Sequence, residues 1–434
     1  MLSLRKILVF WLPLSATWMM MSVEGPFLAA IIARLPEPKY NLAAYGVAYA
    51  IALMVEAPII MIMSATTALV HNRQTFLKLR RFIYTLNIII TSSMVILLLP
   101  FIFNFLTQKL IGLPADVSHL THQAVLILLP WPGAIGYRRF YQGVLIRCNL
   151  TRRVAYGTIV RLLAMSTMAL VLYKFFRVDG ALLGAASLSS AVTLEAVASR
   201  FMAHQAVKSL LAKDEPETIP DHKLTYLSIT RFYYPLALTS MLGLGVQPLV
   251  TFFLGHSRMA LESLAAFPVV NSLVFLFRGM GLSYQEVGVA LLGKQNENYL
   301  PLRKFAQILG ISVITALSMI AYTPLSEVWY LQVSGLSPEM VQFALLPTRI
   351  LAILPGLTVL LAFQRSLLVN NKKTVHITIA TAIEVCTIVL ILFFATRRLN
   401  MIGIIAAAMA MLTGRVLANS YLFVPYFKVL KNQK

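Results

Sequence analysis

The segment Phe10-Trp-Leu-Pro-Leu-Ser-Ala-Thr17 recurs as Phe232-Tyr-Tyr-Pro-Leu-Ala-Leu-Thr239, 222 residues further along the chain. At the same offset, Leu42-Ala-Ala-Tyr45 falls on Leu264-Ala-Ala-Phe267. The further matches at offsets of 222 or 223 are Pro26 with Pro248, Leu79-Arg80-Arg81-Phe82 with Leu302-Arg303-Lys304-Phe305, and Tyr141-Gln142 with Phe363-Gln364. A shared offset over several segments predicts that the chain contains two copies of one structural unit.

The composition identifies the environment in which these copies fold. Of the 434 residues, 59% are hydrophobic and 12% are charged, and the mean hydropathy is +0.77. Soluble domains are typically about 45–50% apolar and about 25% charged. The sequence therefore predicts an all-α polytopic membrane protein. Its two cysteines have no metal-binding or redox spacing.

The number of spans follows from the length of the apolar segments. A membrane-spanning helix needs about 20 apolar residues. The predicted spans are 7–33, 42–70, 82–107, 121–146, 154–176, 180–207, 228–255, 262–292, 305–326, 341–369, 374–396 and 400–427. The stretch between the two sets of six is the most charged and least apolar part of the chain. We therefore predict an N-terminal lobe at 1–209, a cytoplasmic linker at 210–227 and a C-terminal lobe at 228–434.

Basic residues predict the orientation. Short connections on one side hold 23 Lys and Arg residues, and those on the other side hold seven. Cytoplasmic loops are the basic ones, so both termini are predicted to be cytoplasmic in the cytoplasmic (inner) membrane. Each copy has an even number of spans, which predicts a parallel repeat with a pseudo-twofold axis along the membrane normal. The net charge of +21 is explained by this topology, so it does not indicate nucleic-acid binding.

Several charges remain inside the predicted spans. Each costs at least about 2.5–3.5 kcal/mol at the centre of a membrane helix, so these residues should face a lobe interior or a water-filled cavity. The basic ones are Arg34, Arg138, Arg139, Arg161, Arg278, Arg349 and Arg415, and the acidic ones are Glu24, Glu56, Glu195, Glu286 and Glu384.

Glu24 precedes Gly25-Pro26 in the first span. Proline removes a backbone hydrogen bond and bends a helix, which frees a carbonyl beside the carboxylate. We predict that Glu24 lies at this bend, faces the N-terminal lobe interior, and binds a coupling proton or Na⁺. The alternative is that Glu24 pairs with an arginine of the same lobe. The second copy keeps the kink at Pro248 but has Val246 at the position of Glu24.

Glu56 and Arg278 are repeat counterparts at the centres of spans two and eight. Opposite charges at equivalent positions near the axis could pair across the cleft between the lobes. Two separate pairs, one inside each lobe, are the equally favoured alternative.

A set of arginines predicts an anion-binding vestibule, because guanidinium groups favour phosphate and carboxylate. Arg138 and Arg139 lie in span four, and Arg349 lies in span ten. For Arg365, anchoring at the cytoplasmic surface is the favoured interpretation. The predicted substrate and coupling residues are Glu24, Glu56, Arg138, Arg139, Gln142, Arg278, Glu286, Arg349 and Gln364, with helix kinks at Pro26 and Pro248.

The sequence lacks the motifs of the common enzyme and pump classes. It has no His-Glu-x-x-His, Gly-x-Ser-x-Gly, Walker or dinucleotide-binding motif. We therefore predict no catalytic residues, no metal and no cofactor beyond a coupling ion.

The chain resembles the multidrug and toxic compound extrusion (MATE) family, within the multidrug/oligosaccharidyl-lipid/polysaccharide (MOP) exporter superfamily. The likeness lies in two six-span lobes, in Arg138-Arg-Phe-Tyr-Gln-Gly143 and in Thr151-Arg-Arg153. A closer resemblance is to the progressive ankylosis family, and it lies in Pro13-Leu14 through Glu24, Leu42 through Tyr49, Tyr234 through Leu238, Pro347 through Ile350 and Lys372 through Thr374. The resemblance implies two lobes that alternate between inward- and outward-facing states.

The resemblance and the arginines together predict a secondary active exporter, an antiporter-like carrier coupled to a cation, for a small organic or phosphate-bearing anion. The alternatives are a MATE-type proton- or sodium-coupled multidrug antiporter and a flippase for a lipid-linked precursor. An intramembrane enzyme or scaffold is the least supported hypothesis. The predicted partners are a small-molecule substrate and membrane lipid, without nucleic acid, and the predicted assembly is a monomer.

Overall fold

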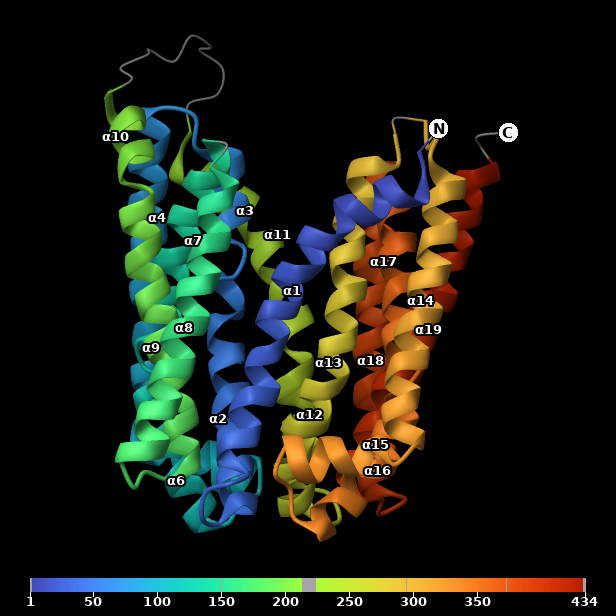
Figure 1. Ribbon diagram of the computed structural model, residues 1–434. Coiled ribbons are helices and arrows are strands. Elements are labelled where there is room, and N and C mark those ends of the chain that lie inside the picture. The colour runs from blue at the N-terminus through green and yellow to red at the C-terminus, as the bar shows by residue number, and fades with distance from the viewer. Residues whose placement is uncertain (1, 149, 213–223, 294, 372, 432–434) are drawn as a thin grey trace. The chain divides into compact units, whose positions relative to one another are not determined.

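The computed structural model describes residues 2–148, 150–212, 224–293, 295–371 and 373–431. Nearly all of these residues are helical (Figure 1). The helices of the first half are α1 (Leu4–Ile32), α2 (Pro38–Glu56), η1 (Ala57–Ile59), α3 (Ile62–Leu69), α4 (Arg73–Leu97), α5 (Pro100–Asn104), η2 (Phe105–Leu110), α6 (Ala115–Ile127), α7 (Trp131–Arg147), α8 (Thr151–Phe175), α9 (Gly180–Met202) and α10 (His204–Ala212).

The second half repeats this order. Its helices are α11 (Tyr226–Leu244), α12 (Val246–Gly255), α13 (Ala260–Leu291), α14 (Tyr299–Tyr322), α15 (Leu325–Glu327), η3 (Val328–Val333), α16 (Pro338–Leu351), α17 (Leu354–Asn370), α18 (Val375–Arg397) and α19 (Gly403–Lys431). Most of the predicted linker, 213–223, lies outside the described residues.

Eleven helical stretches among the described residues are long and apolar enough to cross a membrane. The predicted all-α polytopic fold is thereby confirmed. The predicted span 121–146 is not among the eleven, because it is divided into α6 and α7 and carries Arg138 and Arg139. Its counterpart, Pro338–Asn370, is divided in the same way into α16 and α17 but is apolar enough to be counted.

Backbone details confirm the predicted duplication. The two π-helical segments, η2 and η3, begin 223 residues apart at Phe105 and Val328. Each is followed by a glycine with a positive φ, 82° at Gly112 and 71° at Gly335. Such angles are open to glycine at little cost because it has no Cβ. These features depend on local sequence, so the two copies share their local conformation as well as their order of helices.

The described chain divides into two compact units that differ from the predicted lobes. Unit 1 comprises Met1–Gly46 and Leu249–Lys434, and unit 2 comprises Val47–Pro248. The first helix of each copy therefore belongs with the other copy's helices: α1 is part of unit 1, and α11 is part of unit 2. The order of the helices along the chain does not determine which helices pack together. The repeat offset in the sequence therefore could not predict that α1 and α11 each pack in the unit of the other copy.

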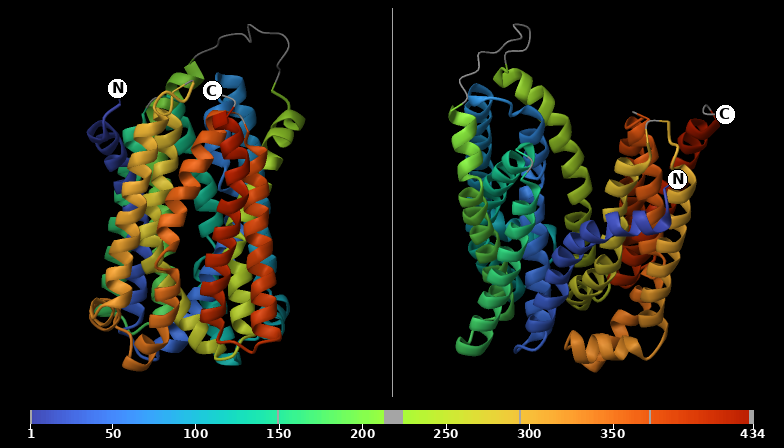
Figure 2. Two further views of the ribbon diagram at one scale, coloured as in Figure 1. Left: turned by 90° about the vertical axis from the view of Figure 1, so that its right-hand side faces the viewer. Right: turned by 45° about the horizontal axis from the view of Figure 1, so that its top comes forward.

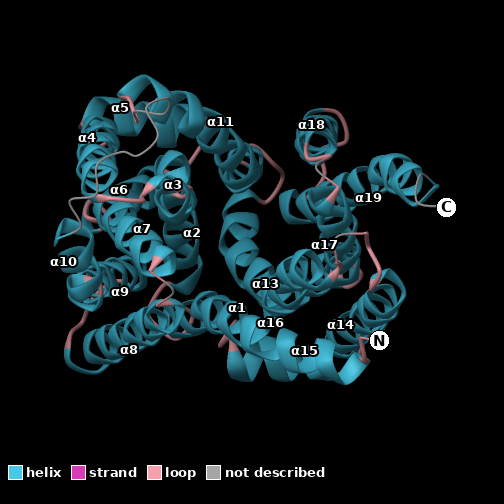
Figure 3. Cartoon of the chain, turned by 90° about the horizontal axis from the view of Figure 1, so that it is seen from above, coloured by secondary structure: helices cyan, strands magenta, loops and turns pink. Residues whose placement is uncertain are grey.

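In unit 1, α17 is the central helix and contacts α13, α14 and α19 (Figure 3). α1 runs along α13 and curves as it does so (Figure 1). The two helices approach closely where glycines face small side chains, because a Cβ on Gly25 would lie 3.0 Å from the Cβ of Ser272. Trp11 Nε1 also donates a 2.9 Å hydrogen bond to Ser283 Oγ. Both contacts fix α1 to unit 1.

In unit 2, α7 is the central helix and contacts α3, α4 and α9. α11 joins this unit at η1, where the chain turns at Pro58. Ser240 Oγ donates to the Ala57 carbonyl at 2.6 Å, and the Tyr233 hydroxyl donates to the Pro58 carbonyl at 2.5 Å. These donors satisfy carbonyls in the irregular turn, which would be costly to leave unpaired inside a membrane.

Candidate functional site

A buried ionic network lies in unit 2 between α7 and α9. Arg138 Nη1 donates to Glu195 Oε2, and Gln142 Nε2 donates to Glu195 Oε1 at 3.1 Å. The three residues are 1–5% exposed. Arg138 and Gln142 are one helical turn apart, so they present both donors to a single carboxylate. The predicted residues Arg138 and Gln142 are brought together, and Glu195 is the residue that joins them.

Glu56 is held separately in the same unit. Trp131 Nε1 donates a 2.5 Å hydrogen bond to Glu56 Oε2, and the charged groups that act on Glu56 are Arg138, Arg139 and Arg161, all of unit 2. Arg139 Nη1 lies 3.9 Å from Met63 Sδ. Unit 2 therefore gathers three guanidinium groups around two carboxylates.

Unit 1 contains a second ionic network, between α18 and α19. Arg415 donates to Glu384 Oε1 from Nε at 2.9 Å and from Nη2 at 2.8 Å. Its remaining nitrogen, Nη1, donates to Thr358 Oγ1 at 3.1 Å. Every nitrogen of the Arg415 guanidinium thus has an acceptor, and two of the three nitrogens donate to the same oxygen of Glu384.

Two further arginines of unit 1 interact with this pair. Glu384 and Arg415 are the charged groups that act on both Arg278 and Arg365. Arg365 Nη2 donates to Thr381 Oγ1 at 3.0 Å. For Arg278, Nε is buried and no described residue accepts a hydrogen bond from it. We call Arg278, Arg365, Glu384 and Arg415 the unit 1 arginine group; it holds three guanidiniums and one carboxylate.

The two networks have opposite signs at corresponding positions. Glu56 corresponds to Arg278 at an offset of 222, and Arg161 corresponds to Glu384 at an offset of 223. The helices that carry the paired acid and base also differ, since they are α9 and α7 in unit 2 but α18 and α19 in unit 1. Each of Glu56 and Arg278 interacts with charges of its own unit. This arrangement agrees with the alternative in which two separate networks form.

Glu24 lies on α1, in unit 1. Its side chain is 6% exposed, but α1 packs mainly on α13 and also on α14, so its neighbours are helices of unit 1 rather than of an N-terminal lobe. Pro26 lies within a continuous α1. In the second copy the helix ends at Leu244, and Pro248 falls in the first turn of α12, where proline is tolerated because the N–H has no helical partner. Only the second copy breaks its helix here.

The remaining predicted residues are dispersed within unit 1. Glu286 interacts with Trp18. Gln364 is fully buried and donates to the Asn419 carbonyl at 3.3 Å. Arg349, predicted to line the anion vestibule, is exposed at the end of α14, where its Nε donates to the Ala321 carbonyl at 3.1 Å and its guanidinium covers the ring of Tyr322.

Five charged members of these networks were absent from the predicted site: Arg161, Glu195, Arg365, Glu384 and Arg415. The sequence signal was present, because four of them are intramembrane charges and neighbouring spans carry the opposite sign. Such charges usually pair with one another. Choosing the partners requires the distance between helices, which the sequence does not contain.

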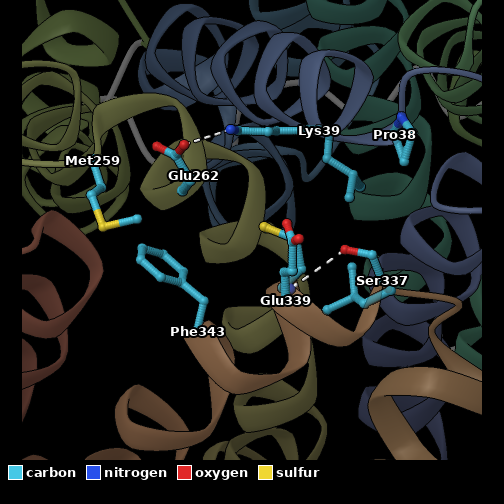
Figure 4. A pocket seen from close by; sticks show the side chains of 10 residues that line it. Pro38, Lys39, Met259, Glu262, Ser337, Glu339 and Phe343 are labelled. Carbon is cyan, nitrogen blue, oxygen red and sulfur yellow. Dashed lines mark hydrogen bonds and ion pairs between the residues drawn. The ribbon is translucent and has the colours of Figure 1, made fainter.

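A small cavity in unit 1, near the start of α2 and α13, is also lined by charged side chains. Lys39 Nζ donates to Glu262 Oε1 at 2.5 Å, and Glu339 and Phe343 line the same cavity of about 210 Å³ (Figure 4). Ligand pockets typically measure about 300–1,000 Å³. The Lys39 and Glu262 side chains are 37% and 26% exposed, so we interpret this pair as a surface contact between α2 and α13.

No family model and no curated protein matches the chain. Solved structures do. An inward-facing MATE family multidrug resistance transporter of the MOP superfamily is 14% identical, with a TM-score of 0.69 over 96% of each chain. The lipid II flippase MurJ, in an inward closed conformation, is 13% identical, with a TM-score of 0.70 over 97% of this chain and 90% of its own.

A MOP superfamily transporter from Pyrococcus furiosus is 14% identical, with a TM-score of 0.64 over 98% of this chain and 97% of its own. At these identities the similarity establishes the fold. The chain accordingly has the fold of MOP superfamily transporters, and its relation to the progressive ankylosis family stays a prediction.

Proposed function

We propose that this protein is a secondary active, alternating-access exporter of a small organic or phosphate-bearing anion, related to the progressive ankylosis family. The observation that carries the proposal is the unit 1 arginine group, in which Arg278 lies with two other guanidiniums around one carboxylate and in which the buried Nε–H of Arg278, like that of Arg365, has no acceptor among the described residues. Buried polar groups are nearly always hydrogen-bonded, and an exception points to a missing ion or water. The two neighbouring arginines and Glu384 provide a net positive charge around it.

The charge balance of the unit 1 arginine group favours an anion. Both hydrogen bonds from Arg415 fall on Oε1 of Glu384, and this one carboxylate cannot balance the charges of three guanidiniums. An uncompensated buried charge is costly, and a phosphate or carboxylate of the substrate would remove that cost. The planar guanidinium presents several N–H groups that match such oxyanions. A hydrophobic organic cation would be repelled by the same group.

The transport cycle is proposed from the fold. MOP superfamily transporters of the same fold have been solved in inward- and outward-facing conformations. We propose that this chain crosses the cytoplasmic membrane twelve times as a monomer with both termini in the cytoplasm. We also propose that Glu24, a buried carboxylate on α1, takes up a coupling proton or Na⁺. An acid in the membrane is costly while charged, which favours binding of a cation.

Reconstitution tests this function. Purified protein in liposomes is given radiolabelled pyrophosphate or citrate, a labelled organic cation, or a fluorescent lipid-linked precursor, each with and without a proton or sodium gradient. We expect gradient-dependent movement of the anions. Movement of the organic cation alone would indicate a multidrug antiporter, and movement of the lipid alone would indicate a flippase; both results would overturn the proposal.

A pair of variants assigns the transport to the arginine group. Arg278→Gln should reduce anion transport at least about tenfold, since it removes a charged hydrogen-bond donor that contributes about 1.5–3 kcal/mol. Arg349→Gln is the matched control, because Arg349 is exposed and bonds only the end of α14. Equal transport by the two variants would show that Arg278 does not contact the anion.

A further inference from the structure

A surface groove lies beside α17 in unit 1. α14 and α19 both pack on α17 and stand on either side of it (Figures 2 and 3). Between them is a cavity of about 480 Å³, which falls within the range of about 300–1,000 Å³ that holds small ligands. We define this groove by Gly310 on α14, Gly356 and Leu360 on α17, and Phe423 on α19.

The groove is apolar along its length and charged at one end. Ile311 and Phe427 line it with side chains that are 66% and 58% exposed. Arg303 lines the end where α14 begins and α19 finishes. There the Tyr299 hydroxyl meets the Tyr426 hydroxyl at 2.6 Å and joins the two walls. An apolar body with a cationic end is the complement of an anionic amphiphile.

We propose that this groove binds one acyl chain of an anionic phospholipid, with the lipid phosphate at Arg303. The length supports a single chain. From Arg303 to Ile314 the groove follows α14 for eleven residues, which is about 16 Å at about 1.5 Å per residue. Half of a hydrocarbon core of about 30 Å is about 15 Å, so the groove extends through one leaflet. This lipid is a bound component and is separate from the transported anion.

The charge at this end of unit 1 selects an anionic headgroup. Arg303, Lys304, Lys428 and Lys431 are all exposed there, against one exposed acid, Glu297, in the preceding turn. Basic residues near a bilayer surface attract anionic lipids. The groove end therefore favours phosphatidylglycerol over phosphatidylcholine.

Unit 2 contains a groove at the corresponding position. A cavity of about 370 Å³ lies between α4 and α7, and six of its seven lining residues fall, at an offset of 223, on residues that line the unit 1 groove. Gly133 corresponds to Gly356 in this way. Asn87, however, replaces Gly310, and Thr91 replaces Ile314. No charged side chain is among the described residues that line the unit 2 groove, whereas Arg303 lines the unit 1 groove, so the duplicated position serves as an internal control for the charge.

Photo-crosslinking tests the proposal. The full chain is reconstituted in phosphatidylcholine vesicles that contain a little phosphatidylglycerol or phosphatidylcholine with a diazirine in its acyl chain, and labelled peptides are mapped. We expect phosphatidylglycerol to label 303–314 and 353–363 about fivefold more than phosphatidylcholine does, the factor that about 1 kcal/mol per basic residue provides. Equal labelling by the two lipids would show ordinary boundary lipid and overturn the proposal.

Three variants sharpen the assignment. Arg303→Gln should lower phosphatidylglycerol labelling about fivefold, whereas Arg80→Gln, its counterpart in unit 2, should leave it unchanged. Gly310→Leu should abolish labelling by both lipids, because its side chain fills the groove. A Cβ at Gly310 would lie 3.9 Å from its nearest neighbours, and leucine is a better helix former than glycine, so the protein should remain folded. Unchanged labelling in Gly310→Leu would also overturn the proposal.

Discussion

Removing the charge of Glu384 should destabilise the protein, and an anion should restore it. Glu384→Gln converts a group of three guanidiniums and one carboxylate into three guanidiniums with none. Removal of one partner of a buried ion pair typically costs about 3–5 kcal/mol. The glutamine keeps an oxygen that can accept from Arg415, so we expect the lower end, about 3 kcal/mol.

A double variant separates charge from packing. Adding Arg415→Met to Glu384→Gln leaves two guanidiniums and no carboxylate, which restores the net charge of the original group. We therefore expect the double variant to be more stable than the sum of the single effects predicts, with a coupling energy of about 2 kcal/mol, within the range for contacting residues. The control is Glu262→Gln, whose partner Lys39 is 37% exposed; such exposed pairs contribute about 0–1 kcal/mol.

The assay is unfolding in detergent micelles, followed by intrinsic fluorescence with and without pyrophosphate. A bound anion stabilises the folded state by mass action, by about 2.7 kcal/mol at a hundred times its dissociation constant. This stabilisation should be larger in Glu384→Gln than in the original protein, because the group is more positive. The reasoning fails if Glu384→Gln unfolds like the original protein, or if pyrophosphate stabilises both equally.

Three further changes test the packing and the coupling. Gly136→Val should destabilise unit 2 by about 1–3 kcal/mol through overpacking, since even a Cβ there would lie 1.8 Å from Asn87 Oδ1; adding Asn87→Gly should recover much of that loss in the same unfolding assay. Glu24→Gln should abolish the gradient dependence of anion transport while the protein elutes as a folded species on size exclusion, and unchanged coupling would exclude Glu24. Trp131→Phe removes the hydrogen-bond donor to Glu56. It should lower the free energy of unfolding by about 1.5–3 kcal/mol, the usual contribution of a hydrogen bond to a charged group. A free energy of unfolding within about 0.5 kcal/mol of the original, roughly the scatter of ordinary surface changes, would show that water replaces the indole as donor.

At one helix–helix contact, the larger and the smaller side chain have changed places between the two copies of the repeat. In unit 2, Asn87 of α4 packs over Gly136 of α7. The corresponding pair in unit 1 is Gly310 of α14 and Val359 of α17, where the large residue has moved to the opposite helix. The helix contact is preserved because the sum of the two side chains is similar. This compensation can be recognised only when the contact between the two residues is known. In a comparison of the two copies by sequence, each substitution alone is simply a mismatch.

The features that the sequence predicted correctly are those that depend on residues close together in the chain. The apolar composition, the length of the spans and the common offset follow from counting, and the paired π-helical segments after Phe105 and Val328 arise from local sequence repeated in both halves. Intramembrane charges such as Arg138 and Arg278 were identifiable for the same reason, because a charge in an apolar stretch is visible without a structure.

The tertiary structure decided which of these residues meet. Glu195 joins Arg138 and Gln142, Glu384 joins Arg415, and α1 packs on α13 instead of on the helices that follow it. These outcomes depend on helix rotation and on small residues such as Gly25 that set the distance between helices. An ion pair forms only within a few ångströms, and residues 31 or 57 positions apart reach that distance through packing alone. The sequence by itself thus determined the class of protein and its duplication, and packing between distant segments decided the site.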